Sequence, residues 1–247
     1  MKPDEIDRIF SQAADGALPP DAGRDTIQRV ESALLNDLRP VRPLAATWVF
    51  TLAFLLLFSG FAVAAGLALG LHGLHALSLG QQALIFPVLL LSAWLAAVGC
   101  VREMCPAGGL RLGAPALMAA ALGMPALFAA LFAALFALLL LHDYSLLNFI
   151  AEGVPCLVAG MSVSIPAGVM MAFVLRRGYV MDWARAGIAA GTLAGLTGLG
   201  MLELHCQNLK AIHVIVWHVA VVVLSALLGY LIGRIADEFR RHRAHQG

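Results

Sequence analysis

Long apolar runs separated by short polar segments dominate the chain from about residue 45 onward. Each run approaches or exceeds the roughly 20 helical residues needed to cross a hydrocarbon core of about 30 Å. Runs of this kind are expected to be helices, because backbone polar groups inside lipid must be paired within the segment. The pattern predicts an all-α polytopic membrane protein with six transmembrane helices in a domain over 45–235. The expected spans are roughly 45–71, 82–101, 114–141, 150–175, 184–204 and 211–233.

Small residues recur every four positions in the fifth run, at Gly187, Gly191 and Gly195. This spacing places the three glycines along one side of a helix. A row of small residues lets two helix backbones approach closely inside a membrane. We therefore expect the fifth helix to pack tightly against a neighbour along this row.

The first 44 residues follow a different pattern, in which many charged residues surround a few apolar positions. The apolar positions recur at helical spacing, which predicts two short amphipathic helices over roughly 3–14 and 22–39. Pro40 and Pro43 end the second helix before the first apolar run. Residues 1–44 are too few to build a core of their own, so we expect a water-exposed arm. Its apolar stripes are Ile6, Ile9 and Phe10, then Ile27, Val30, Leu34 and Leu38.

Basic residues are concentrated in alternate loops, which predicts the orientation in the membrane. The segments after the second and fourth runs and the C-terminal segment carry most of them: Arg102, Arg111, Arg176, Arg177, Arg185, Arg234, Arg240, Arg241 and Arg243. The loops between them hold no Lys or Arg except Lys210. Cytoplasmic loops carry the excess of Lys and Arg. Both termini are therefore expected in the cytoplasm, with a basic tail over 236–247.

The composition agrees with lipid as the surroundings of most of the chain. Of the 247 residues, 61% are hydrophobic and 13% are charged, whereas a soluble domain carries about 25% charged residues. The formal net charge of +1 gives no indication of direct nucleic-acid binding. The charged N-terminus lacks the early apolar core of a signal peptide. The expected location is a lipid bilayer crossed several times.

Side chains that bind metals or react with oxidants gather near the predicted outer end of the helices. Cys156, early in the fourth run, and Cys206, at the end of the fifth, are expected at comparable depth. With His205, His213 and His218 they form a candidate set of metal ligands, and thiols beside imidazoles suit a soft metal ion or an oxidant. Each feature also has an ordinary interpretation, because a membrane cysteine is often a small hydrophobe and an interfacial histidine is often only amphipathic.

Familiar catalytic and metal-binding motifs are absent from the sequence, which has no HExxH, CxxC, P-loop or GxSxG pattern. The protein is therefore expected not to be an enzyme and to hold no resident cofactor, with heavy-metal binding at most transient. Charged residues are nearly absent from the apolar runs, whereas an ion-coupled transporter usually needs them near the midplane. A small metal or solute transporter and a thiol-type membrane oxidoreductase, with Cys156 and Cys206 as its dithiol, stay open as alternatives.

The C-terminal half of the chain resembles the negative-regulator-of-sigma-F (NrsF-type) family. The resemblance is carried by "CLVAGMSVSIPAGVMMAFVLRRG", "ARAGIAAGTLAGLTGLGMLELHC" and "AIHVIVWH", within about 150–235. Its most characteristic features are a cysteine early in the fourth run, the Leu-Arg-Arg-Gly end of that run and the His-Cys that ends the fifth. The sequence departs from the family pattern at Gln207 and Asn208, where a proline and an acidic residue are common. It also departs at Trp217 and His218, where an aromatic pair is common.

The resemblance implies a six-helix anti-sigma factor of the bacterial inner membrane, with an extracytoplasmic-function sigma factor as its partner. In that family, membrane cysteines are implicated in sensing heavy metals or oxidative stress. The matching positions in this chain are Cys156 and Cys206. The oligomeric state stays open.

The composition of the arm narrows the mode of binding that the resemblance implies. The arm contains no cysteine and no histidine, so it cannot be a zinc-binding anti-sigma domain. Its eight carboxylates against six Lys and Arg residues favour a protein partner over an anionic membrane surface. We expect its apolar stripes to dock into a groove of the sigma factor and to hold it at the membrane. A signal at the cysteines would then release the sigma factor, by proteolysis or by a reversible conformational change.

Overall fold

The computed structural model describes two long stretches of the chain and a few isolated helical positions. The described residues are 46–105, 146–244 except Leu209, and single positions within 11–32 and 116–130. None of them belongs to a strand, in agreement with the predicted all-α class. Most of the third predicted span, 114–141, and most of the N-terminal arm lie outside the described residues.

The chain divides into two units, residues 1–44 and 45–247, and the helices with defined bounds belong to the second. They are α3 (Thr47–Leu69), α4 (His72–Ala76), α5 (Leu79–Met104), α7 (Leu146–Leu175), α8 (Trp183–His205), α9 (Ala211–His213), the π-helical turn η1 (Val214–His218) and α10 (Val219–Ala244).

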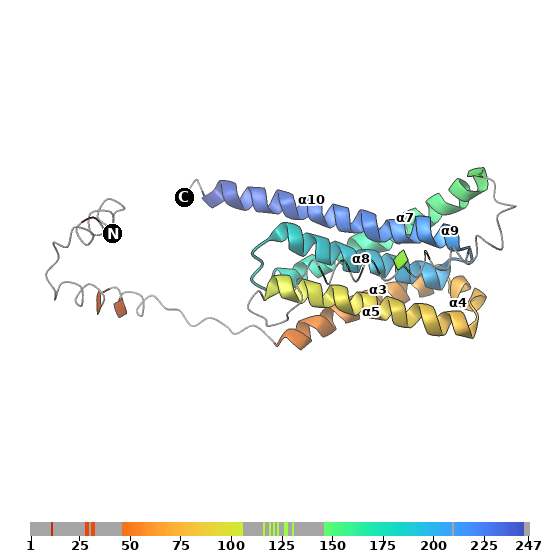
Figure 1. The fold of residues 1–247 in the computed structure, drawn as a ribbon, viewed down its shortest axis with the longest axis horizontal. Coiled ribbons are helices and arrows are strands. Elements are labelled where there is room, and N and C mark those ends of the chain that lie inside the picture. The colour runs from red at the N-terminus through yellow and green to blue at the C-terminus, as the bar shows by residue number, and fades with distance from the viewer. Residues whose placement is uncertain are drawn as a thin grey trace. The chain divides into compact units, whose positions relative to one another are not determined.

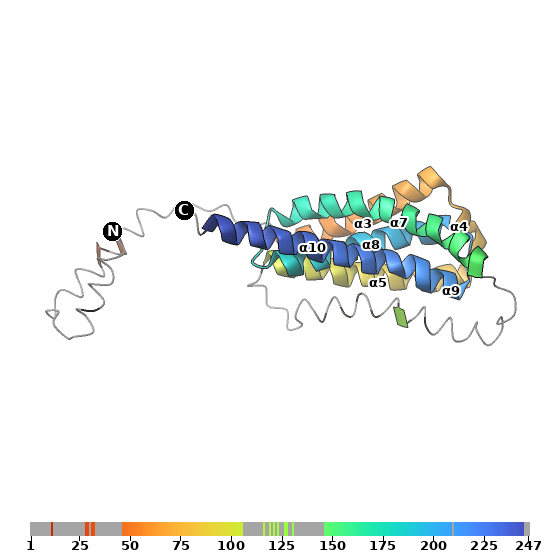
Figure 2. The same cartoon turned by 90° about the horizontal axis from the view of Figure 1, so that it is seen from above.

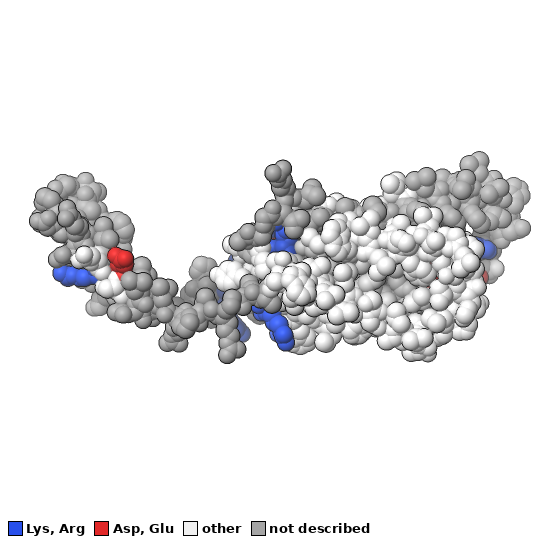
Figure 3. Space-filling view, turned by 90° about the horizontal axis from the view of Figure 1, so that it is seen from below, with Lys and Arg blue, Asp and Glu red and all other residues white. Residues whose placement is uncertain are grey.

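Five of the described helical segments are long and apolar enough to cross a membrane. They are Thr47–Leu69, Leu79–Met104, Leu147–Leu175, Trp183–His205 and Val214–Arg243. Large apolar side chains such as Leu56, Trp94 and Ile232 are exposed on their outer surface. Figure 3 shows one face of the bundle on which Lys, Arg, Asp and Glu are confined to the ends. Such a surface fits lipid better than water.

Helix α8 lies at the centre of the bundle, with α3, α5, α7 and α10 packed around it (Figures 1 and 2). In the apolar stretch of α8, 83% of the residues are buried, against 22% to 44% in the other four spans. The predicted row of Gly187, Gly191 and Gly195 faces α10. A side chain at Gly187 would run into the carbonyl group of Gly229. The prediction of close helix packing along this row is confirmed.

Two carboxylates hold the start of α8. The N-cap residue Asp182 accepts a hydrogen bond from the backbone N–H of Arg185 at 2.9 Å. Asp237 of α10 accepts from the N–H groups of Trp183 and Ala184 at 3.2 and 3.1 Å. The first N–H groups of a helix have no partner within the helix itself. Asp237 therefore caps α8 and ties α10 to it at the same time.

Helix α10 runs past the predicted end of the last span and continues to Ala244. Basic residues that the sequence assigned to the tail over 236–247 therefore lie on its final turns. Arg240 is one of them, and it donates a hydrogen bond to the backbone carbonyl of Val180 at 3.2 Å. The tail thus begins as a helix in contact with the segment that joins α7 to α8.

A sharp turn and a short helix cover the opposite end of α8. Gly70 follows α3 with φ of 100°, a left-handed conformation that glycine adopts without steric cost. In helix α4, Gly73 lies so close to α8 that a side chain there would meet the carbonyl oxygens of Glu203 and Cys206. This contact fixes the end of α8 and the position of Cys206 just beyond it.

Candidate functional site

Two cysteines from different helices meet where α8 ends. Cys156 lies on α7, and Cys206 is the first residue after α8. Their Sγ atoms are 3.5 Å apart, and both cysteines are free. A disulfide bond is about 2.05 Å long, so the two sulfur atoms touch without being bonded. The structure thus brings together the two thiols that the sequence predicted at comparable depth.

The position of Cys156 depends on a contact between glycine and tryptophan. Gly153, one helical turn before Cys156, lies directly against the indole ring of Trp217, where no side chain would fit. The same indole packs against the ring of Phe149, with centroids 5.5 Å apart. These contacts hold the first turns of α7 against η1, and they bring Cys156 close to the histidines of that segment.

The π-helical turn η1 places two histidines side by side. In an α-helix, residues five positions apart are separated by about 140° around the axis, because each residue turns about 100°. Here the N–H of Val219 donates to the carbonyl of Val214, which is the hydrogen-bond pattern of a π-helix. As a result, the rings of His213 and His218 meet edge to face with centroids 5.4 Å apart. Both histidines are fully buried.

The two thiols and the two imidazoles form a single cluster. The Sγ atom of Cys206 is 3.7 Å from Nε2 of His213. One ligand atom from each of Cys156, Cys206, His213 and His218 lies within 4.8 Å of all the others. Cys156 is partly buried and the other three residues are buried. Thiolate sulfur and imidazole nitrogen are the donors that zinc and softer metal ions prefer. We call these four residues the thiol–imidazole cluster.

A buried carboxylate lies beside the cluster. Glu203 is 3% exposed, and it is the one acidic residue among the buried polar side chains of the described residues. Its Oε1 atom accepts a hydrogen bond from Nδ1 of His218 at 2.9 Å. This bond orients the ring and leaves Nε2 of His218 with no hydrogen-bond partner in the described part of the chain. Glu203 is thus buried against a specific partner.

The hydrogen bond with Cys156 and desolvation by burial raise the pKa of the Cys206 thiol above its usual value. The imidazoles of His213 and His218 oppose this rise without cancelling it. The raised pKa favours the neutral thiol form of Cys206. A metal ion or an oxidant that reacts at this sulfur has to displace its proton.

The other residues singled out by the sequence lie elsewhere. The Nδ1 atom of His205 is 3.0 Å from the carbonyl oxygen of Gly70, and the ring packs edge-on against His72. His205 was predicted with the candidate ligands, but it lies outside the cluster. Cys100 and Cys105 lie at the far end of α5. The predicted sigma-binding residues lie outside the described part of the chain: Ile6, Ile9, Phe10, Ile27, Val30, Leu34 and Leu38.

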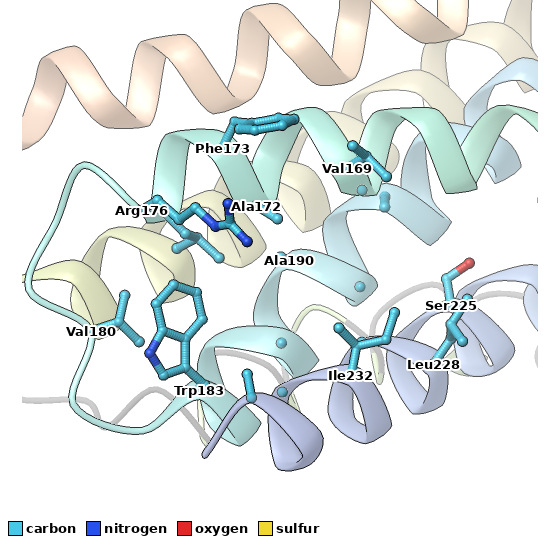
Figure 4. Close-up of a pocket in the computed structure, with 18 of the residues that line it drawn as sticks. Val169, Ala172, Phe173, Arg176, Val180, Trp183, Ala190, Ser225, Leu228 and Ile232 are labelled. Carbon is cyan, nitrogen blue, oxygen red and sulfur yellow. The ribbon is translucent and has the colours of Figure 1, made fainter. Parts of the chain in front are cut away.

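A groove of about 890 Å³ opens at the other end of the bundle, between α7, α8 and α10 (Figure 4). Val169, Phe173 and Ile232 form its apolar walls, and Arg176 and Trp183 lie toward one end. The described residues that line it include no cysteine, histidine or carboxylate. The groove therefore lacks the chemistry of the thiol–imidazole cluster, which is the stronger candidate site.

The fold and the cluster define a class of protein. The described part of the chain is helical, and its five long apolar helices suit a membrane. Its clustered thiols and imidazoles are donors that suit a metal ion or an oxidant. The chain belongs to the NrsF family, because the family's sequence profile, described as "Negative regulator of sigma F", matches residues 34–236. The resemblance noted in the sequence is confirmed. Neither a curated protein nor a solved structure matches the chain.

Family membership defines the general role of the protein. It is a negative regulator with a sigma factor as its partner, so its process is the regulation of transcription. This role agrees with the predicted anti-sigma activity. The family is one of regulators and is not a known enzyme family, in line with the lack of catalytic motifs in the sequence.

Proposed function

We propose that this protein is an anti-sigma factor of the bacterial inner membrane that sequesters an extracytoplasmic-function sigma factor. The family match over residues 34–236 carries the proposal, because it spans the end of the arm and nearly all of the described bundle. The apolar helices provide the means to stay in a bilayer. A sigma factor held at the membrane is kept away from RNA polymerase, which accounts for negative regulation.

The N-terminal arm is the part of the chain that we assign to sigma binding. The two apolar stripes predicted from its sequence suit insertion into an apolar groove. They are Ile6, Ile9 and Phe10 in the first and Ile27, Val30, Leu34 and Leu38 in the second. Gln28 and Ser32 are exposed helical positions that fall away from the second stripe at helical spacing. They are matched controls for substitutions in the stripe.

Cys156 and Cys206 are the residues that we assign to signal reception. A peroxide oxidises one thiol to a sulfenic acid and leaves as water or an alcohol. The second thiol then displaces water and forms a disulfide. A soft metal ion instead replaces the proton of each thiol and bridges the two sulfur atoms. Either event ties α7 to the end of α8, and the free thiols lie 3.5 Å apart, which is close enough for both.

Packing offers a route from the cysteines to the arm. Leu204 is two residues before Cys206, and its side chain lies 3.0 Å from where a Cβ atom of Gly66 on α3 would be. Gly200, one turn earlier, faces Phe58 and Ala62 of the same helix. Helix α3 is the helix that follows the arm in the sequence. A signal that moves the end of α8 therefore favours another packing of α3 and weakens the hold on the sigma factor.

Co-purification from a detergent extract tests sigma binding. We expect the unmodified protein to retain a sigma factor, and we expect the Phe10→Asp, Leu34→Asp double variant to lose it. The Gln28→Asp, Ser32→Asp double variant should retain it, because both residues lie off the apolar stripe. If the unmodified protein retains no sigma factor, the proposal fails. Metal flux in vesicles and disulfide exchange with partner proteins would then test the transporter and oxidoreductase alternatives.

Release of the bound sigma factor tests signal reception. The Cys156→Ser and Cys206→Ser variants should still retain the sigma factor but should no longer release it after treatment with peroxide or Cd²⁺. Cys105→Ser is the matched control, since Cys105 follows the far end of α5. If the Cys156→Ser and Cys206→Ser variants both released the sigma factor normally, these cysteines would be excluded as the residues that receive the signal.

A further inference from the structure

We infer that the thiol–imidazole cluster is a four-coordinate site for Zn²⁺ or Cd²⁺, in which Glu203 holds His218 in the orientation for binding. The site uses one donor each from Cys156, Cys206, His213 and His218. The regulatory meaning of the site rests on the proposed function. Metal binding itself is a property of the bundle and needs no sigma factor.

The spacing of the donor atoms fits a tetrahedral site. With Zn–S and Zn–N bonds of about 2.3 and 2.0 Å, two sulfur ligands lie about 3.8 Å apart, and a sulfur and a nitrogen lie about 3.5 Å apart. The sulfur atoms of Cys156 and Cys206 are 3.5 Å apart. The Cys206 sulfur and Nε2 of His213 are 3.7 Å apart. Because the four ligand atoms lie within 4.8 Å of one another, small side-chain rotations complete the geometry.

An unpartnered nitrogen points to a ligand at this place. Nε2 of the fully buried His218 has no hydrogen-bond partner in the described part of the chain. Buried polar atoms are normally paired, and leaving one unpaired is destabilising. Glu203 holds the opposite nitrogen, Nδ1, at 2.9 Å, so the lone pair of Nε2 is available to a metal. A carboxylate that orients a metal-binding imidazole in this way is the usual second layer of a zinc site.

The charge of the filled site also suits its surroundings. A divalent cation bound by two thiolates and two neutral imidazoles has no net charge, which limits the energetic penalty of burial in an apolar bundle. On binding, the cation replaces one proton on each thiol. Two protons leave, and no electrons are transferred. Hard cations such as Mg²⁺ prefer oxygen ligands, so the donor set selects a soft or borderline ion.

The filled site would join three separate segments of the chain. Cys156 belongs to α7 and Cys206 follows α8, while His213 ends α9 directly before η1 and His218 ends η1. The π-turn is the feature that brings His213 and His218 to one ion. A ligand that binds only the folded state stabilises it. Metal binding should therefore raise the melting temperature of the bundle and fix the geometry of η1.

Cobalt substitution and metal titration test the inference on the full-length protein in detergent. We expect one Co²⁺ per chain, with the intense visible bands of tetrahedral thiolate coordination, and displacement of Co²⁺ by Zn²⁺ and by Cd²⁺. Comparing the two displacement curves shows which ion the site prefers, and Mg²⁺ should displace nothing. Cys156→Ser, Cys206→Ser, His213→Ala and His218→Ala should each abolish the tetrahedral spectrum. His205→Ala should preserve it, because that ring lies outside the cluster.

Two further measurements keep the inference testable where a variant fails to fold. In the unmodified chain, Cd²⁺ should slow the alkylation of Cys156 and Cys206 but not that of Cys105. Glu203→Ala should weaken metal binding about 10- to 100-fold, the usual effect of removing such a supporting carboxylate, and should broaden or shift the cobalt bands. Glu203→Gln should recover part of the affinity, because its amide oxygen still accepts from Nδ1.

The outcomes separate this inference from the proposed function. Saturable binding of Co²⁺ that survives both His213→Ala and His218→Ala would overturn the four-coordinate site, as would binding of no Co²⁺ at all. Retention of a sigma factor by a protein that binds no metal would leave the anti-sigma proposal intact. Metal binding without any retained sigma factor would overturn the anti-sigma proposal and leave the metal site intact.

Discussion

The contact of α8 with the last helical segment, η1 and α10, has two halves that are built on different principles. Along Gly187, Gly191 and Gly229, the two backbones approach so closely that an added side chain would meet a carbonyl group. Toward the other end, Glu203 and His218 are joined by a 2.9 Å hydrogen bond, and the neighbouring thiols and imidazoles form a cluster. Both halves are buried, but one contains almost no functional groups and the other contains nearly all of them.

The difference shows how one helix contact can keep a fixed packing at one end and change its side-chain partners at the other. Backbone-to-backbone packing allows essentially one arrangement, because any sliding creates clashes or voids. The polar half contains groups with several alternative partners, since a thiol can bind another thiol, an imidazole or a metal ion. A change at the polar half can therefore shift the end of α8 while the glycine half keeps the helices together.

The largest loss of stability is expected from a side chain introduced into the glycine half of the contact, along Gly187, Gly191 and Gly229. Gly187→Leu should destabilise the bundle by about 3 kcal/mol or more, because the new side chain overpacks a contact with the backbone of Gly229. Gly60→Leu is the matched control, since nothing lies within 4 Å of an added Cβ there. Thermal unfolding of both variants in detergent measures the effect. Equal melting temperatures would contradict the contrast between the two halves.

A smaller loss of stability is expected, in the absence of metal, from a change in the polar half of the contact, around Glu203 and His218. Glu203→Ala leaves Nδ1 of His218 buried without its acceptor, which should destabilise the protein by about 1–3 kcal/mol. Thr197→Val is the control, because that buried hydroxyl only bonds to Leu193 in its own helix. Unfolding in the presence of a chelator measures both. If Thr197→Val were the more damaging change, the Glu203–His218 pair would not be a structural link.

The cap that Asp237 provides at the start of α8 should contribute still less to the stability of the folded protein. Asp237→Ala removes the acceptor of two N–H groups at the start of α8, for which we expect a loss of about 1–2 kcal/mol. The neighbouring Glu238→Ala should change stability little, because its 3.8 Å pair with Arg234 is largely exposed. Thermal unfolding distinguishes the two. Similar melting temperatures would show that water replaces the cap.

The smallest effect is a change in thiol reactivity without loss of stability. The raised pKa of Cys206 predicts slow alkylation near pH 7 and a rate that rises at a higher pH than for a free thiol. Cys156→Ala removes the hydrogen bond that is the first cause of the shift. The pKa should then fall, and the rate near neutral pH should increase. A pH profile of alkylation in a variant lacking Cys100 and Cys105 measures this, and an unchanged profile would contradict the assigned cause.

Much of the fold was predictable because long apolar runs have few alternatives inside a membrane. The predicted run 45–71 became Thr47–Leu69, and 184–204 became Trp183–His205. The glycine row was predictable for a similar reason, since its spacing repeats within one helix. For Cys156 and Cys206, the sequence predicted only that they lie at comparable depth in the membrane. Their 3.5 Å contact depends on which helices are neighbours, and apolar runs carry no such information.

The sequence identified His213 and His218 as candidates, but it carried no signal of the contacts that they make. Glu203 and His218 are 15 positions apart on two sides of a turn, so no helical period relates them. The π-turn brings His213 and His218 together at a spacing that an ordinary α-helix would separate. His205 looked equivalent to them in the sequence, but it turned toward Gly70. A helical pattern identifies the segment, but it does not identify a local change in the helix type.

The sequence by itself determined that the chain is helical, that most of it suits lipid and that it resembles the NrsF family. The first two properties follow from local composition and periodicity along the chain, and the resemblance rests on short sequence motifs. Only the tertiary structure decided that α8 lies at the centre and that Glu203 is buried. It also decided that two thiols and two imidazoles from separate segments form the thiol–imidazole cluster. Those properties arise from packing between distant segments, where a glycine at position 73 or 153 determines which backbones can meet.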